Sequence, residues 1–253
     1  MTVGGRDVTD DAGLRYAVED GVATITLDRP ARRNAFTVAT IDAWVGRLRE
    51  AAADEDVRVV VLTGAGDAFC AGIDLAVLDA LERTPLAVKQ LLRKIHGVAL
   101  ALDDLDKPTI AAINGAAVGA GLDMALLCDL RLAARSARLS EGYIKVGLVP
   151  GDGGAWLLPR LVGPAKAMEL LLTGDFVPAE EALRLGMVNH VVDDDALLDR
   201  TYELARRIAA AGPVQVAMIR RLVRQSHAMD LRTHLDLVSS HAAVIGDFSH
   251  HRL

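Results

Sequence analysis

The chain has few of the features that would tie it to a membrane, to nucleic acid or to an oxidising compartment. Its two cysteines, Cys70 and Cys128, make no disulfide framework, so we expect reduced thiols and a cytoplasmic protein. Its longest apolar runs fall well short of the roughly 18 residues that a membrane span needs, and we expect no cleavable leader. A net charge of −6 argues against a general nucleic-acid surface. We therefore expect neither a membrane nor a nucleic acid as a partner.

The composition that remains is that of an ordinary globular protein. Hydrophobic residues make up 51% of the 253 residues, which is enough to bury a core without disulfides or a metal ion. We expect no metal site, and the length suits one large domain.

Strand-like and helix-like patterns alternate along the first two thirds of the chain, which predicts a parallel α/β arrangement. The pattern of residues 14–27 is typical of a β-hairpin. The runs VRVVVLTG and KPTIAAING are typical of buried parallel strands. We divide the chain into a flexible N-terminal tail at 1–12, an α/β core at 13–195 and a C-terminal helical region at 196–253. Helices are expected near 38–52, 85–102, 154–160, 164–173, 179–185, 195–211, 213–227 and 229–246, with short strands at DLRLAA, ARLS and VNHVV.

The stretch GAAVGAGLDMALLCD places a loop of small residues directly before a carboxylate, Asp123. If a strand ends near Asn114 and a helix begins near Gly121, the N–H groups at 119–121 have no partner within the helix, and the helix dipole favours negative charge there. Such a loop suits a phosphate, a close-packed turn, or a thioester oxygen that becomes negative during a reaction. The spacing matches neither G-x-G-x-x-G nor a P-loop, so both nucleotide fingerprints fail.

A second loop of small residues, FCAGIDL, also follows a buried strand and offers another free N–H, from Ile73. Two converging N–H donors make an oxyanion hole. With this loop included, the sequence resembles the crotonase (enoyl-CoA hydratase/isomerase) superfamily. The resemblance rests on RPARRNAF, AFCAGIDL, INGAAVGAGLDMALLCDLRLAA and VGLVPGDGGAWLLPRLVG, which occur in the family's order and spacing. LLLTGDFVPAEEALRLGMVNHVV extends the match, which covers roughly residues 13 to 247.

The resemblance implies a crotonase-like spiral of ββα units with a C-terminal helical trimerisation region. It also implies a homotrimer or a hexamer made of two trimers, and an acyl-CoA substrate with no cofactor beyond the coenzyme A of that substrate. By position, the two oxyanion donors would be the backbone N–H groups of Ile73 and Ala120. Ala120 stands where many members have a glycine, and alanine keeps the N–H. The residues matched to the coenzyme A region are Arg32, Arg33, Asn34, Ala35, Ala71 and Asp74. Without the resemblance, the two arginines would be interpreted as a solvated basic loop.

The side chains expected to do the chemistry depart from the hydratase pattern. Hydratases of the family present two glutamates that position and activate one water. In this chain Asp123 takes the first position and Tyr143 the second, while Glu141 lies two residues before the tyrosine. A shift of a double bond along the acyl chain needs only an oxyanion hole and one base. We therefore predict isomerase-type proton transfer in preference to hydration.

Each of these side chains also has a structural interpretation. Asp123 could be a helix-start carboxylate bonded to backbone N–H groups, and Tyr143 a plain half-buried aromatic instead of a donor to the substrate. Asp152, in PGDGGAW, is another candidate base. Some isomerases of the family have an aspartate in this loop, but it aligns one position earlier, where this chain has Gly151. Asp152 would also suit an N-cap for a helix from Gly153. At the level of function, the alternatives are an acyl-CoA-binding member with weak or no hydratase activity, or another crotonase reaction such as decarboxylation or thioester hydrolysis.

Overall fold

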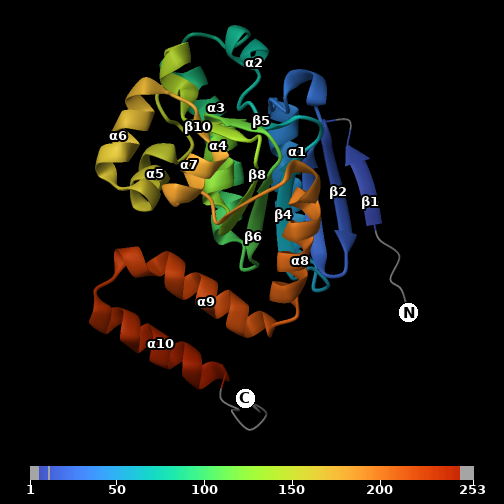
Figure 1. Ribbon diagram of the computed structural model, residues 1–253, viewed down its shortest axis with the longest axis vertical. Coiled ribbons are helices and arrows are strands. Elements are labelled where there is room, and N and C mark those ends of the chain that lie inside the picture. Colours follow the sequence, from blue (N-terminus) through green and yellow to red (C-terminus); the bar gives the residue numbers. More distant parts are fainter. Residues whose placement is uncertain (1–5, 11, 246–253) are drawn as a thin grey trace.

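The computed structural model describes residues 6–10 and 12–245, which form an α/β protein built on two sheets (Figure 1). The larger sheet has, in spatial order, β1 (Arg6–Asp10), β2 (Leu14–Glu19), β3 (Val22–Leu27), β4 (Val59–Gly64), β6 (Thr109–Ile113), β8 (Leu130–Ala134) and β11 (His190–Val192). The smaller sheet has β10 (Val177–Pro178), β9 (Arg138–Ser140), β7 (Ala116–Val118) and β5 (Ala68–Cys70). The strands from β3 to β11 run parallel, whereas β1, β2 and β3 are antiparallel neighbours.

Three successive pairs of strands, β4–β5, β6–β7 and β8–β9, each send the first strand into the larger sheet and the second into the smaller one. Helices follow each pair, so the predicted spiral of ββα units is confirmed. The α-helices are α1 (Val38–Ala53), α2 (Leu75–Asp79), α3 (Pro85–Asp104), α4 (Ala120–Leu127), α5 (Gly154–Val162), α6 (Pro164–Thr173), α7 (Ala179–Arg184), α8 (Leu197–Ala209), α9 (Pro213–Gln225) and α10 (Leu231–Ile245).

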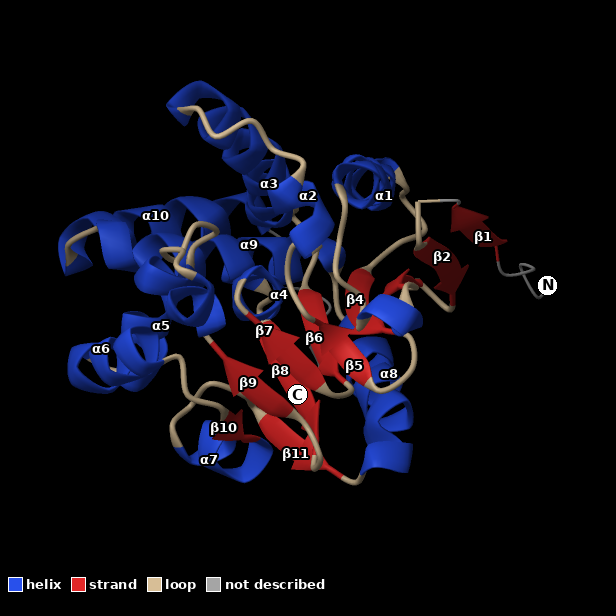
Figure 2. Cartoon of the chain, turned by 90° about the horizontal axis from the view of Figure 1, so that it is seen from above, coloured by secondary structure: helices blue, strands red, loops and turns tan. Residues whose placement is uncertain are grey.

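The central strands are continuous apolar runs because helices cover both faces of the larger sheet. All five residues of β6 are buried, as are five of the six in β4. Helices α1 and α3 pack together above the sheet in Figure 2, and α8 lies on the opposite face, against β3, β4, β6 and β8. The predicted hairpin, buried strands and long helices are therefore in place.

One part of the predicted organisation needs correction. Residues 6–10, expected to belong to a flexible tail, form β1 and pair in antiparallel register with β2. Their sequence, RDVTD, has no apolar alternation, and the strand is held by main-chain pairing at the sheet edge. Helix α8, which follows the boundary expected at 195/196, packs on the larger sheet and buries Leu197, Thr201 and Ala205. Residues 1–5 and 11 of the expected tail, and 246–253 of the expected C-terminal region, lie outside the described residues.

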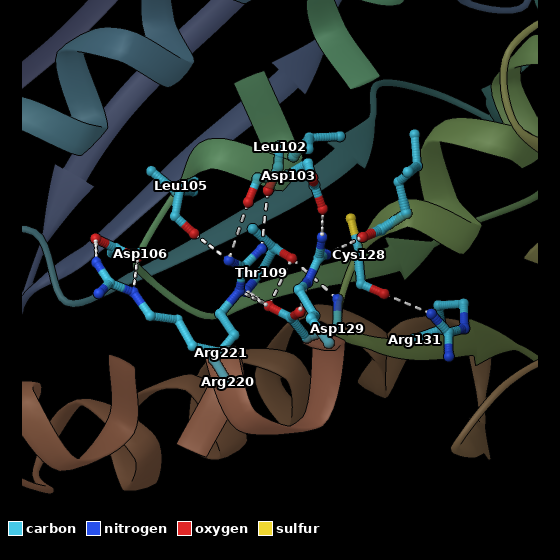
Figure 3. A network of polar contacts seen from close by, with 12 residues as sticks. Leu102, Asp103, Leu105, Asp106, Thr109, Cys128, Asp129, Arg131, Arg220 and Arg221 are labelled. Carbon is cyan, nitrogen blue, oxygen red and sulfur yellow. Dashed lines mark hydrogen bonds and ion pairs between the residues drawn. The ribbon is translucent and has the colours of Figure 1, made fainter. Parts of the chain in front are cut away.

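Helices α9 and α10 form a separate layer at the end of the molecule opposite α2 (Figure 1). Arginines of α9 attach this layer to the core (Figure 3). The Arg220 Nε donates to Asp129 at 2.8 Å and its Nη2 to the Leu102 carbonyl at 2.8 Å, while Arg221 pairs with Asp106. No helix among the described residues combines the length and apolar character needed to cross a membrane. The layer also exposes apolar side chains, namely Val214, Ile219, Val223, Leu231, Leu235 and Val244.

Candidate active site

The two loops of small residues meet where β5 and β7 end side by side. A Cβ on Gly121 would lie 2.3 Å from the Cys70 carbonyl oxygen, and one on Gly72 would lie 3.0 Å from the Val118 carbonyl oxygen. Gly72 also has a φ of 89°, which a residue with a side chain rarely adopts. The small residues are therefore required for the close approach of two backbone segments, as one of the interpretations of the sequence had it.

This contact places the Ile73 and Ala120 peptides next to each other. Ala120 is the first residue of α4, and a Cβ on Gly72 would lie 3.5 Å from its nitrogen. Phe36 donates to the Gly72 carbonyl and accepts from the Asp74 N–H, both at 2.9 Å, which leaves the Ile73 N–H outside this pairing. Within residues 6–10 and 12–245, no acceptor receives a hydrogen bond from the Ile73 or the Ala120 N–H. The two groups predicted as oxyanion donors are thus neighbours and unpaired.

A cluster of buried acidic groups lies beside α4. Asp123 belongs to the first turn of this helix and is fully buried. The Tyr143 hydroxyl, from a 3₁₀ turn at Gly142–Val146, lies 2.6 Å from Asp123 Oδ2 and 3.1 Å from Asp152 Oδ2. Glu141 is 2% exposed and precedes the same turn. Three carboxyl groups and a phenol from three different segments therefore share one interior site.

Gly154, the first residue of α5, makes room for this cluster. A Cβ at this position would lie 2.3 Å from Asp123 Oδ1 and 2.6 Å from Glu141 Oε2. Both carboxyl groups thus approach the same point on the backbone, which no residue with a side chain would permit. The sequence indicated the start of a helix near Gly154 but gave no sign of this contact.

Burial raises the pKa of every member of the cluster. It raises the pKa of Asp123 to about 6, an effect that the Tyr143 hydrogen bond opposes. Burial and the charge of Asp123 raise the pKa of Glu141 to about 10, and burial also raises the pKa of Asp152. The pKa of Tyr143 is raised by burial and by these acids, so its phenol stays neutral. Asp123 is thus the group suited to give and take a proton near neutral pH.

The contacts in the cluster bear on the structural interpretations of Asp123, Tyr143 and Asp152. The Asp123 carboxylate bonds to the Tyr143 hydroxyl, not to the N–H groups of its own helix. Asp152 does not cap α5, because Gly153 occupies the N-cap and no side chain bonds there. The N-cap interpretation of Asp152 is therefore wrong. Tyr143 is more than an aromatic filler, since its hydroxyl bridges two carboxyl groups.

His96, on α3, belongs to no motif of the sequence. Its Nε2 lies 2.8 Å from the Gly151 carbonyl oxygen and 3.9 Å from Asp152 Oδ1, and 43% of its side chain is exposed. The contact with Gly151 joins positions 55 residues apart, so no local spacing in the sequence predicts it. The sequence placed Glu141 two residues before the expected glutamate position and left it among the possible acid–base groups. Its approach to Asp123 is likewise a tertiary contact, between separate segments of the chain.

The loop matched to the coenzyme A region is held mainly by its own residues. The Asn34 Nδ2 donates to the carbonyl oxygens of Ala65 at 2.8 Å and Ala68 at 2.7 Å, and its Oδ1 accepts from the Arg29 N–H. Asp74 caps α2 and pairs with Arg29 at 3.0 Å, and the backbone N–H bond of the cap and this arginine lower its pKa. The side chains of Asn34 and Asp74 therefore order the loop.

The other residues matched to the coenzyme A region contribute either a backbone contact or an exposed positive charge. The Ala71 N–H donates to the Arg33 carbonyl at 2.9 Å, which ties the two loops together, and Ala35 is buried. Arg32 and Arg33 are exposed, and neither forms an ion pair with another residue of the described ranges. These two cations are the members of the set that remain available to an anionic ligand.

Comparison with known proteins agrees with this architecture. Residues 17–247 match the model of a family described as enoyl-CoA hydratase/isomerase. A 1,2-epoxyphenylacetyl-CoA isomerase of Escherichia coli (strain K12) is 38% identical over 237 residues, which cover 93% of this chain and 90% of the relative. A short-chain-enoyl-CoA hydratase of Clostridium acetobutylicum is 35% identical, over 86% and 83% of the two chains.

A solved structure, that of an enoyl-CoA hydratase from Bacillus anthracis, superposes with a TM-score of 0.87 at 33% identity, covering 96% of this chain and 92% of that one. The relatives carry both hydratase and isomerase names. The choice between these reactions for the present chain must therefore come from its own side chains.

Proposed function

Because the chain belongs to the enoyl-CoA hydratase/isomerase family, we propose that it acts on an acyl-CoA thioester and moves a carbon–carbon double bond in preference to adding water across one. The observation that carries this proposal is the 2.6 Å hydrogen bond between the Tyr143 hydroxyl and Asp123. In a hydratase two carboxylates act together on one water. A neutral phenol that already donates to Asp123 cannot replace the second of them.

The proposed reaction starts from a 3-enoyl-CoA and uses Asp123 as its base. The carboxylate removes a proton from the carbon next to the carbonyl, and the electrons of that C–H bond move toward the thioester oxygen. The N–H groups of Ile73 and Ala120 stabilise the resulting negative oxygen. Asp123 then returns a proton to the γ carbon, which gives the conjugated 2-enoyl-CoA. A base with a pKa of about 6 is suited to both halves of this exchange.

The proposed partner is the coenzyme A thioester itself, with Arg32 and Arg33 meeting its phosphates through charge-assisted hydrogen bonds. The proposed assembly is a homotrimer or a pair of trimers. It is supported by the apolar side chains that α9 and α10 leave exposed. A cytoplasmic location is supported by Cys70 and Cys128, which are buried as free thiols whose pKa values burial raises to about 12.

Asp123→Asn tests the proposal against simple acyl-CoA binding. We expect isomerase turnover to fall by about 10²–10⁴-fold, the usual effect of losing a positioned acid–base group, while binding of a coenzyme A thioester persists. Asp42→Asn, at an exposed aspartate that pairs with Lys94, is the matched control. Full turnover in Asp123→Asn would show that another group is the base. Thioester binding by the wild-type chain without any turnover would identify a binding protein instead.

A further inference from the structure

A line of polar groups leads from Asp123 toward the surface. Asp123 Oδ2 lies 2.6 Å from the Tyr143 hydroxyl, and this hydroxyl lies 3.1 Å from Asp152 Oδ2. The other oxygen of Asp152, Oδ1, lies 3.9 Å from His96 Nε2. Asp123 is fully buried and Asp152 is 4% exposed, whereas 43% of the His96 side chain is exposed. The buried base therefore connects to a solvated imidazole through two intermediate groups.

We propose that Tyr143, Asp152 and His96 form a proton relay that connects Asp123 with solvent, so that the proton taken from the substrate exchanges with water during the reaction. The relay rests on the proposed function, because it requires Asp123 to accept a substrate proton. Asp152 and His96 act in it through Tyr143 and need not touch the substrate.

The bridging hydroxyl fixes how protons are arranged at rest. A phenol has one hydrogen to donate, yet Tyr143 lies within hydrogen-bond distance of two carboxyl groups. When it donates to the closer one, Asp123, the Asp152 carboxyl must carry a proton and donate to the phenol oxygen. Burial favours this neutral form of Asp152. The resting direction of donation is therefore from Asp152 through Tyr143 to Asp123.

Proton uptake from the substrate allows this direction to reverse. The His96 ring first exchanges with water to the tautomer that carries its hydrogen on Nδ1, which leaves Nε2 bare. The Asp152 carboxyl turns its O–H from the phenol toward His96, Nε2 takes that proton, and Nδ1 releases its own to water. The O–H of Asp123 then donates its proton to the phenol oxygen while the original phenol hydrogen moves to Asp152. One proton has left the site, Asp123 is again a carboxylate, and no phenolate has formed. The same steps in reverse bring a solvent proton to Asp123 for delivery to the γ carbon.

His96 is placed to serve as the outer end of this relay. Its Nε2 already lies 2.8 Å from the carbonyl oxygen of Gly151, the residue next to Asp152 in the chain. A small rotation of the ring would move this nitrogen from that carbonyl to Asp152 Oδ1, which has no hydrogen-bond partner among residues 6–10 and 12–245. An imidazole can take a proton on one nitrogen and release one from the other, so it can pass protons without leaving its place.

Isomerisation of a 3-enoyl-CoA in D₂O tests the relay directly. Mass spectrometry of the early 2-enoyl-CoA product gives the number of solvent deuterons per turnover, a ratio that a general loss of stability would not change. We expect most wild-type product to carry deuterium. His96→Gln and Asp152→Asn should lower the ratio by about tenfold or more, because neither amide transfers protons as the native group does. His190→Gln, at an exposed histidine on β11, should leave it unchanged.

Each outcome separates the relay from the reaction it serves. Turnover by the wild type with product that carries only substrate hydrogen would overturn the relay and leave the proposed function standing. An unchanged deuterium ratio in both His96→Gln and Asp152→Asn would overturn it as well. No turnover in the wild type would remove the proposed function and the relay together. Recovery of the ratio in His96→Gly when free imidazole is added would support the role of the ring itself.

Discussion

Replacing Tyr143 by phenylalanine perturbs the acidic cluster at its centre while keeping the aromatic ring. The loss of the hydroxyl removes the donor to Asp123 and leaves a buried carboxylate without that partner. Because this hydrogen bond holds the pKa of Asp123 down against the effect of burial, the pKa should rise above its value of about 6.

The size of the shift follows from the kind of bond that is lost. A hydrogen bond to a charged group contributes about 1.5–3 kcal/mol, and about 1.4 kcal/mol corresponds to one pKa unit. The pKa of Asp123 should therefore increase by about one to two units. The base must be ionised to act, so activity is lost as the pH falls through this pKa. The acidic limb of kcat/KM should move from near pH 6 in the wild type to about pH 7–8 in the variant.

Initial rates of 3-enoyl-CoA isomerisation, followed through the absorbance of the conjugated product between about pH 5 and pH 9, measure this limb. Tyr202→Phe is the matched control, because Tyr202 is a half-buried tyrosine of α8 whose hydroxyl bonds to Thr24 instead. Its limb should stay at the wild-type position. An acidic limb in Tyr143→Phe that does not move, or that moves to lower pH, would refute the reasoning about Asp123.

Three further substitutions test other parts of the structure. Gly154→Ala puts a Cβ 2.3 Å from Asp123 Oδ1, so it should abolish turnover and lower the free energy of unfolding by about 1–3 kcal/mol. Its control, Gly46→Ala, lies in open space on α1 and should raise the free energy of unfolding by up to about 1 kcal/mol. Equal melting temperatures of the two variants would contradict the proposed clash at Gly154. Glu141, whose pKa burial raises from 4.5 to about 10, forces the folded chain to hold a proton, so stability falls as pH rises above 4.5. Glu141→Gln should therefore increase the free energy of unfolding at neutral pH by on the order of 3 kcal/mol, measured by urea denaturation, and change it little at acid pH. An equal increase at both pH values would count against the raised pKa of Glu141. Arg220→Met leaves Asp129 without one of its cations and should weaken the attachment of α9 by about 3–5 kcal/mol, seen as faster amide hydrogen exchange in that helix; unchanged exchange would mean that Arg220 does not hold it.

The fold could be predicted where the sequence showed a hydrophobic pattern or motifs that resemble those of a known family. The buried runs of β4 and β6 and the hairpin at 14–27 are local signals, and the structure confirms them. Strand β1 could not be predicted, because its sequence, RDVTD, shows no apolar alternation, although its main chain pairs with β2. The three-residue strands β5 and β7 are too short for any alternation to appear, so the sequence suggested only loops.

The candidate site shows the same division between local and tertiary information. The small residues around Ile73 and Ala120 indicated exposed backbone N–H groups, and the structure brings the two loops together. What joins Asp123 to Tyr143, and Asp152 to His96, is packing between separate helices and turns, which no spacing encodes. The sequence favoured an N-cap role for Asp152, because a carboxylate just before a helix commonly caps it. In the structure its side chain contacts the Tyr143 hydroxyl instead.

The most direct test of the central claim is a comparison of two initial rates in one preparation of the wild-type chain, isomerisation of a 3-enoyl-CoA and hydration of crotonyl-CoA. A phenol bonded to Asp123 in place of a second carboxylate predicts that isomerisation is clearly the faster reaction. Hydration at a rate equal to or above that of isomerisation would contradict the account, because it would mean that Asp123 and its neighbours activate water despite the bridging tyrosine.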